Sequence, residues 1–312
     1  MTLNRLRSIR ELPALTLFAI VVFWLLVMLP SFRTSVNLSQ VAQQAGLLGI
    51  LVCGEALVIL TGGVDLSVGA TAALCSCFAA SLMQSGWPWP LGIAAAVIAG
   101  AACGYLNGAL ITYRKLPPIL TTLATLLLFR AITNIATGSV PYNHIPENVK
   151  SIGAGIGPFL LFIALAGGFA VMLTHMRFGR RVIAVGASES AVRLSGVDTH
   201  SVLRRVYLLC GACAGLAGLL IGAASNSAQA NLADGYELDV ISAVVIGGVR
   251  LTGGEGSAIG AAIGALIIVV MRNALVLYGR PPEQYGLVTG AIILLAAFAE
   301  QMRRSREAVV IA

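Results

Sequence analysis

Charged residues are scarce in this chain of 312 residues. Only 11% of them are Asp, Glu, Lys or Arg, whereas 58% are hydrophobic, and the mean hydropathy is +0.90. A soluble domain usually carries about 25% charged residues. Apolar surface in such excess has to face lipid, so the composition excludes an ordinary soluble enzyme. It predicts an all-α, polytopic integral membrane protein.

Catalytic and metal-binding patterns are absent as well. The chain contains no Gly-Lys pair, so the phosphate-binding motif G-x-x-x-x-G-K-[ST] cannot occur, and it contains no H-E-x-x-H motif. Its six cysteines all lie in apolar segments, among Ala, Gly, Leu and Phe, which favours reduced packing residues over a metal or redox centre. We therefore expect no enzymatic activity, no bound cofactor and no metal site. Any ATP used would be hydrolysed by another polypeptide.

Apolar segments recur at lengths that suit membrane crossing, which takes about 20 residues. We predict about ten transmembrane helices, at Leu12–Pro30, Val41–Leu60, Leu66–Met83, Trp89–Thr112, Ile119–Ala136, Pro158–His175, Val206–Ala224, Leu238–Val249, Ser257–Tyr278 and Gln284–Ala299. The eighth has apolar length for only about 20 Å of helix, against a hydrocarbon core of about 30 Å. We expect it to be tilted, broken or shielded inside the bundle.

Basic residues indicate the orientation, because positively charged loops stay in the cytoplasm. With ten spans both termini are cytoplasmic, and most of the 20 Lys and Arg residues fall on that side. Nine spans would place Arg303, Arg304 and Arg306 outside. The net charge of +7 therefore indicates topology and not nucleic-acid binding.

The longest polar interruption runs from Arg177 to Arg205 and holds six arginines against two acids, which places it in the cytoplasm. A short amphipathic helix is predicted at its centre. Ser188 can cap the start of this helix, and Gly196 can end it in the left-handed conformation. One small capped helix exposed to the cytoplasm suits a protein that is moved by a partner. We expect a single domain over residues 1–312, with this loop at about 177–205.

The segment TGGVDLSVGA, residues 61–70, is the most structured motif. Two glycines end the second span, Asp65 follows, and a helix is expected to begin at Leu66. One interpretation makes Asp65 the N-cap of that helix. The other makes the segment a broken-helix element that lines a solute path. The two interpretations are compatible.

Other acidic and basic residues are predicted near or within the membrane. Asp234, Glu237 and Asp239 precede or begin the short eighth span. Asp234 and Glu237 have capping-box spacing, and the alternative is that this group receives a polyhydroxy solute from outside. Glu55 is a candidate cavity or gate residue, because an unpaired charge at membrane depth is costly. Two arginines, at positions 130 and 272, are either functional for the same reason or snorkel to an interface.

Two motifs are echoed in the second half of the chain. GGVDLSVG at 62–69 resembles GGVRLTGG at 247–254, and NGALITYRKLPP at 107–118 resembles NALVLYGRPP at 273–282. The first pair joins hairpins of the same orientation, whereas the second joins span ends on opposite sides. One simple duplication does not explain both, and a diverged two-half architecture remains a hypothesis. The 35 glycines favour closely packed helices and a gated path over an open pore.

Four segments together resemble one family. They are TGGVDLSVGA at 61–70, LPPILTTLATLLLFRAI at 116–132, GRRVIAVGASESAVRLSG at 179–196 and YELDVISAVVIGGVRLTGGEGSAIGAAIGAL at 236–266. In this order they resemble the permease subunits of bacterial monosaccharide ABC importers, of which ribose, xylose, arabinose and galactose permeases are the nearest members. The resemblance covers almost the whole chain after the first span. One departure is Arg250-Leu251-Thr252, where relatives usually carry a small or hydroxylated residue before Leu-Ser.

The resemblance implies a membrane core of two permeases in the bacterial inner membrane, formed with a second copy or a paralogue. It also implies a cytoplasmic ATPase and a periplasmic sugar-binding protein as partners. Candidate residues of the solute path are Glu55, Asp65, Ser67, Asn107, Glu237 and Asp239. Candidate residues for coupling to the ATPase are Arg180, Arg181, Gly186, Ser188, Glu189, Arg193 and Gly196.

Three other functions remain open from the sequence. A related ABC permease could carry nucleosides, a signalling furanone or branched-chain amino acids. A stand-alone secondary transporter would need a coupling group at mid-membrane, for which Glu55 is the strongest candidate, but it would leave the docking-like loop unexplained. An intramembrane enzyme has no catalytic constellation to support it.

Overall fold

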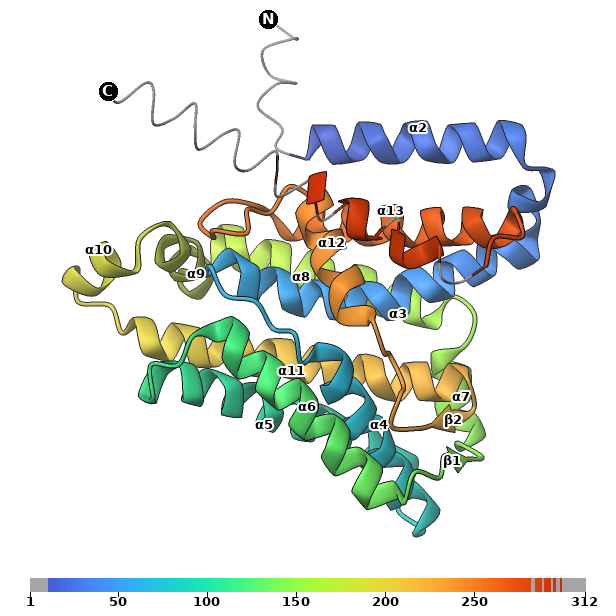
Figure 1. Ribbon diagram of the computed structural model, residues 1–312, viewed down its shortest axis with the longest axis horizontal. Helices are drawn as coiled ribbons and strands as arrows, with labels where there is room; N and C mark the ends of the chain where they lie inside the picture. Colours follow the sequence, from blue (N-terminus) through green and yellow to red (C-terminus); the bar gives the residue numbers. More distant parts are fainter. Residues whose placement is uncertain (1–10, 282–283, 288, 293, 296–297, 299–312) are drawn as a thin grey trace, which may run out of the picture.

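The fold is a bundle of helices that run mostly side by side (Figure 1). A computed structural model describes residues 11–281, 284–287, 289–292, 294–295 and 298. The helices are α2 (Leu12–Met28), α3 (Ser35–Leu60), α4 (Val68–Gln84), α5 (Trp89–Tyr113), α6 (Pro118–Thr137), α7 (Glu147–Gly153), α8 (Gly157–His175), α9 (Arg177–Ala187), α10 (Glu189–Leu194), α11 (Thr199–Ala224), α12 (Tyr236–Ile246) and α13 (Ala258–Leu277), with the 3-10 helix η1 (Pro30–Arg33).

Six of these helices are long and apolar enough to cross a membrane: α3, α5, α6, α8, α11 and α13. Two more apolar helices, α2 and α4, have 17 residues each. The expected eighth span is α12, which has only 11 residues and packs against α3 and α13. The described residues of the expected tenth span, 284–287, 289–292, 294–295 and 298, are helical, and its other residues lie outside the described ranges. The all-α membrane class is confirmed, and the count of ten remains a prediction.

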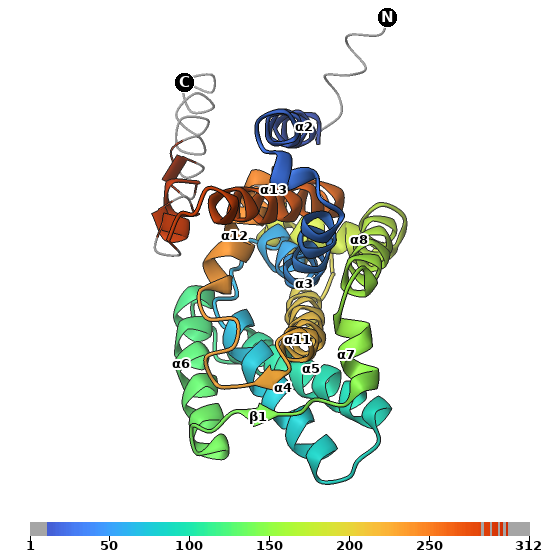
Figure 2. The ribbon, with the colours of Figure 1, turned by 90° about the vertical axis from the view of Figure 1, so that its right-hand side faces the viewer.

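The two 26-residue helices, α3 and α11, occupy the middle of the bundle. The end-on view in Figure 2 shows them at the centre, with α2 outermost beside α13. Helix α11 packs against α3, α4 and α5. Because both central helices are apolar around most of their circumference, their buried faces follow from their neighbours and not from an amphipathic pattern.

Small residues set the distance between α5 and α11. A Cβ added at Gly100 would collide with the carbonyl of Gly211, and one added at Gly211 would collide with the carbonyl of Gly100. Gly104 meets the carbonyl of Tyr207 in the same way. The two backbones therefore touch, which is the packing that small residues four apart permit in membranes.

The polar loop forms two helices, α9 and α10, whereas the sequence predicted one. Ser188 ends α9 and also caps α10, since its hydroxyl oxygen accepts the N–H of Ala191 at 3.3 Å. Gly196 has a φ of +81°, as the predicted left-handed end requires. Helices α9 and α10 lie at one end of the bundle in Figure 1. The opposite end carries α7 and the antiparallel pair β1 (Tyr142–Asn143) and β2 (Ser227–Ala228).

The two echoed glycine segments meet inside the fold. A Cβ at Gly62 would lie 3.1 Å from the carbonyl oxygen of Thr252. The N–H of Gly254 donates to the carbonyl oxygen of Leu60 at 2.9 Å. The end of α3 and the loop after α12 are therefore held together by backbone contacts, and the missing side chain of Gly62 leaves room for Thr252.

Candidate functional site

The centre of the candidate site is the break between α3 and α4. Asp65 lies in this break, and its Oδ1 accepts the N–H of Ser67 at 2.9 Å and the hydroxyl of Ser67 at 2.6 Å. Helix α4 begins at Val68, with Ser67 in the N-cap position. The expectations of a helix from Leu66 and of Asp65 as its N-cap are therefore wrong. The carboxylate instead closes the turn that leads into α4, because an Asp side chain can accept the backbone N–H two residues further on.

Helices α3 and α5 supply the partners of this turn. Asn107 on α5 donates through Nδ2 to the Ser67 hydroxyl at 2.9 Å and approaches Oδ1 of Asp65 at 3.4 Å. Glu55 on α3 accepts the N–H of Asp65 at 2.9 Å through Oε1. We call these four residues, Glu55, Asp65, Ser67 and Asn107, the polar layer. All four side chains are buried, and the structure thus brings together four of the six solute-path candidates.

Glu55 does not line any of the pockets described below. Its second oxygen, Oε2, accepts from the thiol of Cys210 on α11 at 3.7 Å. The side chain therefore connects α3, the break and α11, and holds the backbone of Asp65 in place. In the described structure Glu55 occupies a supporting position behind the turn.

The other two solute-path candidates lie on α12 and have separate surroundings. Asp239 pairs with Arg272 on α13 and accepts the hydroxyl of Thr289 at 3.0 Å. Glu237 is closer to the break, because a Cβ at Gly69 would lie 2.9 Å from its Oε2. No hydrogen-bond partner for this oxygen is found within the described ranges.

The capping box expected from Asp234 and Glu237 is wrong. Gly235, with a φ of +79°, precedes α12, and no side chain caps this helix. Asp234 instead faces Arg130 on α6 at 3.7 Å. The sequence spacing was correct for a cap, but the glycine between the two acids turns the chain before the helix starts.

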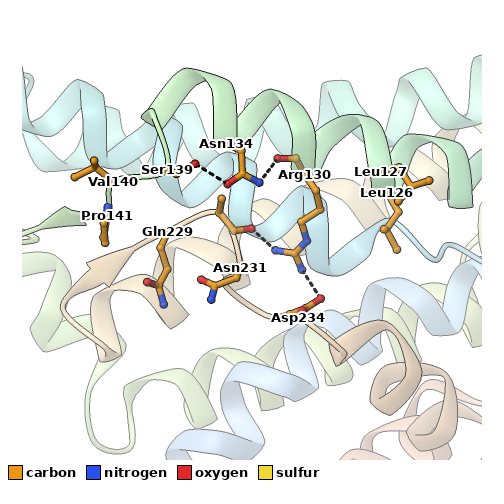
Figure 3. A pocket seen from close by; sticks show the side chains of 11 residues that line it. Leu126, Leu127, Arg130, Asn134, Ser139, Val140, Pro141, Gln229, Asn231 and Asp234 are labelled. Carbon is orange, nitrogen blue, oxygen red and sulfur yellow. Dashed lines mark hydrogen bonds and ion pairs between the residues drawn. The ribbon is translucent and has the colours of Figure 1, made fainter.

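A pocket of about 560 Å³, here called the Arg130 pocket, lies between α6 and the loop before α12 (Figure 3). The guanidinium of Arg130 donates to the carbonyl oxygens of Ala230 at 2.5 Å and Leu232 at 2.7 Å, in addition to its contact with Asp234. The remaining polar lining is uncharged, and consists of Asn134, Ser139, Gln229 and Asn231. Arg130 therefore fastens the loop to α6 and forms one wall of the pocket.

A second pocket of about 470 Å³, here called the Tyr207 pocket, lies at the other end of α6. Its lining includes the glycines of the α3–α4 break, the α5–α6 loop and parts of α10 and α11: Thr61, Gly62, Gly63, Thr112, Lys115, Pro117, Pro118, Glu189, Arg193, His200 and Tyr207. Gly63 lines this pocket, whereas Gly69 lies beside Arg130 at the first one. Residues 64–68, with Asp65 and Ser67, therefore stand between the two pockets.

The candidate coupling residues divide into an outer and an inner group. Arg180 and Arg181 are exposed on α9 and line a surface hollow of about 370 Å³ between α9 and α10. Gly186 is packed against the carbonyl of Leu60, where an added Cβ would collide. The polar loop thus touches the break between α3 and α4 directly.

The rest of this group lies on or beside α10. Glu189 pairs with Arg193 one turn later and accepts the hydroxyl of Thr199 at 3.0 Å. This last contact ties α10 to the first turn of α11. Ser188 and Gly196, described above, cap the two ends of α10.

Sequence reasoning missed Tyr207, which lines one pocket and reaches the break. A tyrosine in a helix otherwise rich in Gly, Ala, Cys and Leu was the available signal, because its hydroxyl needs a polar partner when buried. All six cysteines are free thiols. Within the part of the chain that the structure describes, no group of three or more His, Cys, Asp or Glu side chains could hold a metal ion.

Comparison with known proteins gives consistent matches over most of the chain. Residues 37–297 match the family described as "Branched-chain amino acid transport system / permease component". The chain is 37% identical to the ribose import permease protein of Escherichia coli strain K12 over 286 residues, 88% of each chain. It is 37% identical to the ribose import permease protein of Bacillus subtilis strain 168 over 298 residues, 93% of this chain and 92% of that one.

A third relative carries a different name. The autoinducer 2 import system permease protein of Salmonella paratyphi B is 32% identical over 265 residues, 83% of this chain and 76% of that one. No solved structure matches the chain.

Proposed function

Since this chain belongs to the family of branched-chain amino acid transport system permease components, we propose that it forms the membrane path for a monosaccharide in an ATP-driven importer. The relatives that match at 37% identity over most of their length are ribose import permeases. The chain contains no phosphate-binding loop, so the ATPase would be a separate subunit.

The observation that carries this proposal is the chemistry of the Arg130 pocket. Its amide and hydroxyl side chains donate and accept hydrogen bonds without charge, as the hydroxyl groups of a neutral sugar require. Arg130 is already engaged by two carbonyl oxygens and by Asp234. A free amino acid carries a carboxylate and an ammonium, each of which needs a counter-charge when it is desolvated. The pocket therefore suits a sugar better than a branched-chain amino acid.

The partners follow from the same family and from the polar loop. We propose that α9 and α10 dock on the ATPase, that a second permease copy or a paralogue completes the membrane core, and that a periplasmic binding protein delivers the sugar. In this arrangement the loop 177–205 and both termini are cytoplasmic, the chain has ten spans, and the Arg130 pocket opens to the periplasm.

Uptake by the reconstituted importer tests the function. The permease is assembled in proteoliposomes with the ATPase and the binding protein of the proposed importer, and ATP-dependent uptake of labelled D-ribose is compared with uptake of labelled valine. We expect D-ribose uptake and no valine uptake. Valine uptake without ribose uptake would overturn the sugar assignment. ATP turnover by the permease alone would overturn the proposal that the ATPase is a separate subunit.

One further solute is favoured by a specific observation, namely the 32% identity to an autoinducer 2 import permease. The same vesicles therefore receive autoinducer 2 as a third probe, and uptake of that compound alone would replace the sugar in this proposal. Addition of a protonophore at constant ATP separates the ABC importer from a secondary transporter. Collapse of uptake under that condition would favour proton coupling, with Glu55 as the first residue to replace.

A further inference from the structure

Two polar atoms next to the break between α3 and α4 have no hydrogen-bond partner among the described residues. They are the hydroxyl of Tyr207 and Oδ1 of Asn107. Tyr207 is 1% exposed and Asn107 is 0% exposed, so neither atom can turn to bulk solvent. A buried polar group without a partner costs about 1–3 kcal/mol, and native proteins contain few such groups. Two of them in one place require an explanation.

The two side chains come from facing helices that touch. Asn107 lies between Gly104 and Gly108 on α5, and both glycines contact Tyr207 on α11. A Cβ at Gly108 would lie 3.2 Å from the Cβ of Tyr207. The close glycine packing of α5 and α11 therefore brings Asn107 and Tyr207 to the same place in the bundle.

The Tyr207 hydroxyl also reaches the break. A Cβ at Gly63 would lie 2.6 Å from this oxygen, so the hydroxyl occupies space that only glycine leaves free. Gly63 comes two residues before Asp65, whose carboxylate Asn107 approaches through Nδ2. Tyr207 lines the pocket named after it, and Asn107 contacts Asp65 and Ser67, which stand between the two pockets. We expect a solute that passes between the two pockets to meet both atoms, because each lies beside the residues that separate the pockets.

The chemistry of these atoms selects a class of solute. A phenol donates and accepts, whereas an amide oxygen only accepts. A sugar hydroxyl can donate its proton to Oδ1 of Asn107 and accept from the phenol of Tyr207. An anion would meet the carboxyl groups of Asp65 and Glu55, and an apolar group would leave both atoms unpaired.

We propose that Tyr207 and Asn107 form a binding site for one hydroxyl group of the transported sugar, at the break between α3 and α4. The site rests on the proposed function, since it takes a solute that this chain transports. The sugar hydroxyl binds there after the turn of residues 62–67 opens. The site thus contributes to the sugar specificity of the membrane path, in addition to the specificity of the binding protein. Tyr207 discriminates between sugars that carry this hydroxyl and analogues that lack it.

A purely structural role for the Tyr207 hydroxyl makes the opposite prediction. If the ring alone matters, removing an unpaired buried hydroxyl leaves transport unchanged and keeps or raises the melting temperature. The variant Tyr207→Phe therefore separates the two roles, because it deletes the hydroxyl and retains the ring. Tyr105→Phe is the matched control, since Tyr105 lies on α5 with 44% of its surface exposed.

The test uses the complete importer in proteoliposomes, with ATPase and binding protein unchanged. Uptake of D-ribose, 2-deoxy-D-ribose, 3-deoxy-D-ribose and 5-deoxy-D-ribose is measured at equal ATP, and each rate is divided by the wild-type rate for the same sugar. This division cancels the preference of the binding protein. For Tyr207→Phe we expect D-ribose uptake to fall about tenfold, which is the effect of one lost hydrogen bond. One deoxy analogue should stay within about twofold of wild type, and Tyr105→Phe should change none of the four.

A second variant moves the hydroxyl instead of deleting it. Gly63→Ala places a Cβ against the Tyr207 oxygen, while its next neighbours are a Val58 carbon at 3.3 Å and a Tyr207 ring carbon at 3.5 Å. We expect Gly63→Ala to lower D-ribose uptake, and the double variant with Tyr207→Phe to transport no worse than Tyr207→Phe alone.

Three results would overturn the site. The first is D-ribose uptake within about twofold of wild type in Tyr207→Phe, and the second is an equal loss for all four sugars. The third is a wild-type importer that hydrolyses ATP but takes up none of the four. That last result refutes the proposed sugar itself and removes the site with it, whereas the first two leave the proposed function intact.

Discussion

The N–H of Gly254 donates to the carbonyl oxygen of Leu60 at 2.9 Å, and this bond joins two glycine segments that lie far apart in the sequence. Gly186 of α9 packs against the same carbonyl and against the N–H of Gly254. The polar loop, the break after α3 and the loop after α12 therefore meet at one point. A displacement of α9 would be passed to both glycine segments through backbone atoms, without a flexible side chain between them.

Gly186→Ala should separate α9 from the backbone of Leu60 and Gly254. An added methyl group collides with the backbone of Leu60, which cannot rotate away as a side chain can. We expect the variant to insert in the membrane. The amount of solute taken up per ATP hydrolysed should fall by more than about tenfold. The matched control is Gly168→Ala on α8, where an added Cβ meets nothing within 4 Å. Equal uptake per ATP hydrolysed in the two variants would show that the contact at Leu60 does not transmit motion.

Arg130→Lys should loosen the loop before α12 although it keeps the charge. A lysine ammonium cannot reproduce the planar fork that reaches the carbonyl oxygens of Ala230 and Leu232 together. We expect faster labelling of a cysteine introduced at Asn231 and a several-fold loss of uptake, with Arg114→Lys as a control. Unchanged labelling of the Asn231 position would refute the fastening role of Arg130.

Helix α10 should depend on its backbone more than on its charges. Ala191→Pro removes the N–H that Ser188 accepts, and Gly196→Val forces a β-branched residue to a φ of +81°. We expect both variants to lose co-purifying ATPase and uptake. Glu189→Gln should cost far less, because its pair with Arg193 is exposed and such pairs contribute about 0–1 kcal/mol. Wild-type co-purification and uptake in Ala191→Pro would exclude α10 as the coupling element.

Asn37 and Asn273 should be energetically coupled. Their side-chain amides exchange two hydrogen bonds, of 3.1 and 2.8 Å, between the first turn of α3 and α13. Both are buried, and polar pairs within membranes are worth about 0.6–1.7 kcal/mol. A double-mutant cycle of Asn37→Ala and Asn273→Ala, measured by unfolding in mixed micelles, should return a coupling energy in that range. If the two single variants changed the free energy of unfolding additively, the predicted coupling between Asn37 and Asn273 would be wrong.

Local features of this protein could be predicted from the sequence because they depend on neighbouring residues. Hydropathy identified the six long helices, since a span needs only a run of apolar side chains. The caps of α10 at Ser188 and Gly196 were also predicted, because a cap involves residues within three or four positions. The capping box predicted from Asp234 and Glu237 was wrong, because Gly235 turns the chain between the two acids before α12 begins.

The sequence by itself determined that this chain is a helical membrane protein with a basic polar loop, because hydropathy and loop charge are properties of segments. The tertiary structure alone decided which side chains share the break: Glu55 beneath Asp65, Asn107 beside Ser67, and Tyr207 against Gly63. A helix that is apolar around most of its surface does not indicate which face meets which neighbour. The close approach of α5 and α11 at their glycines sets that choice for these two helices, and with it the positions of Asn107 and Tyr207.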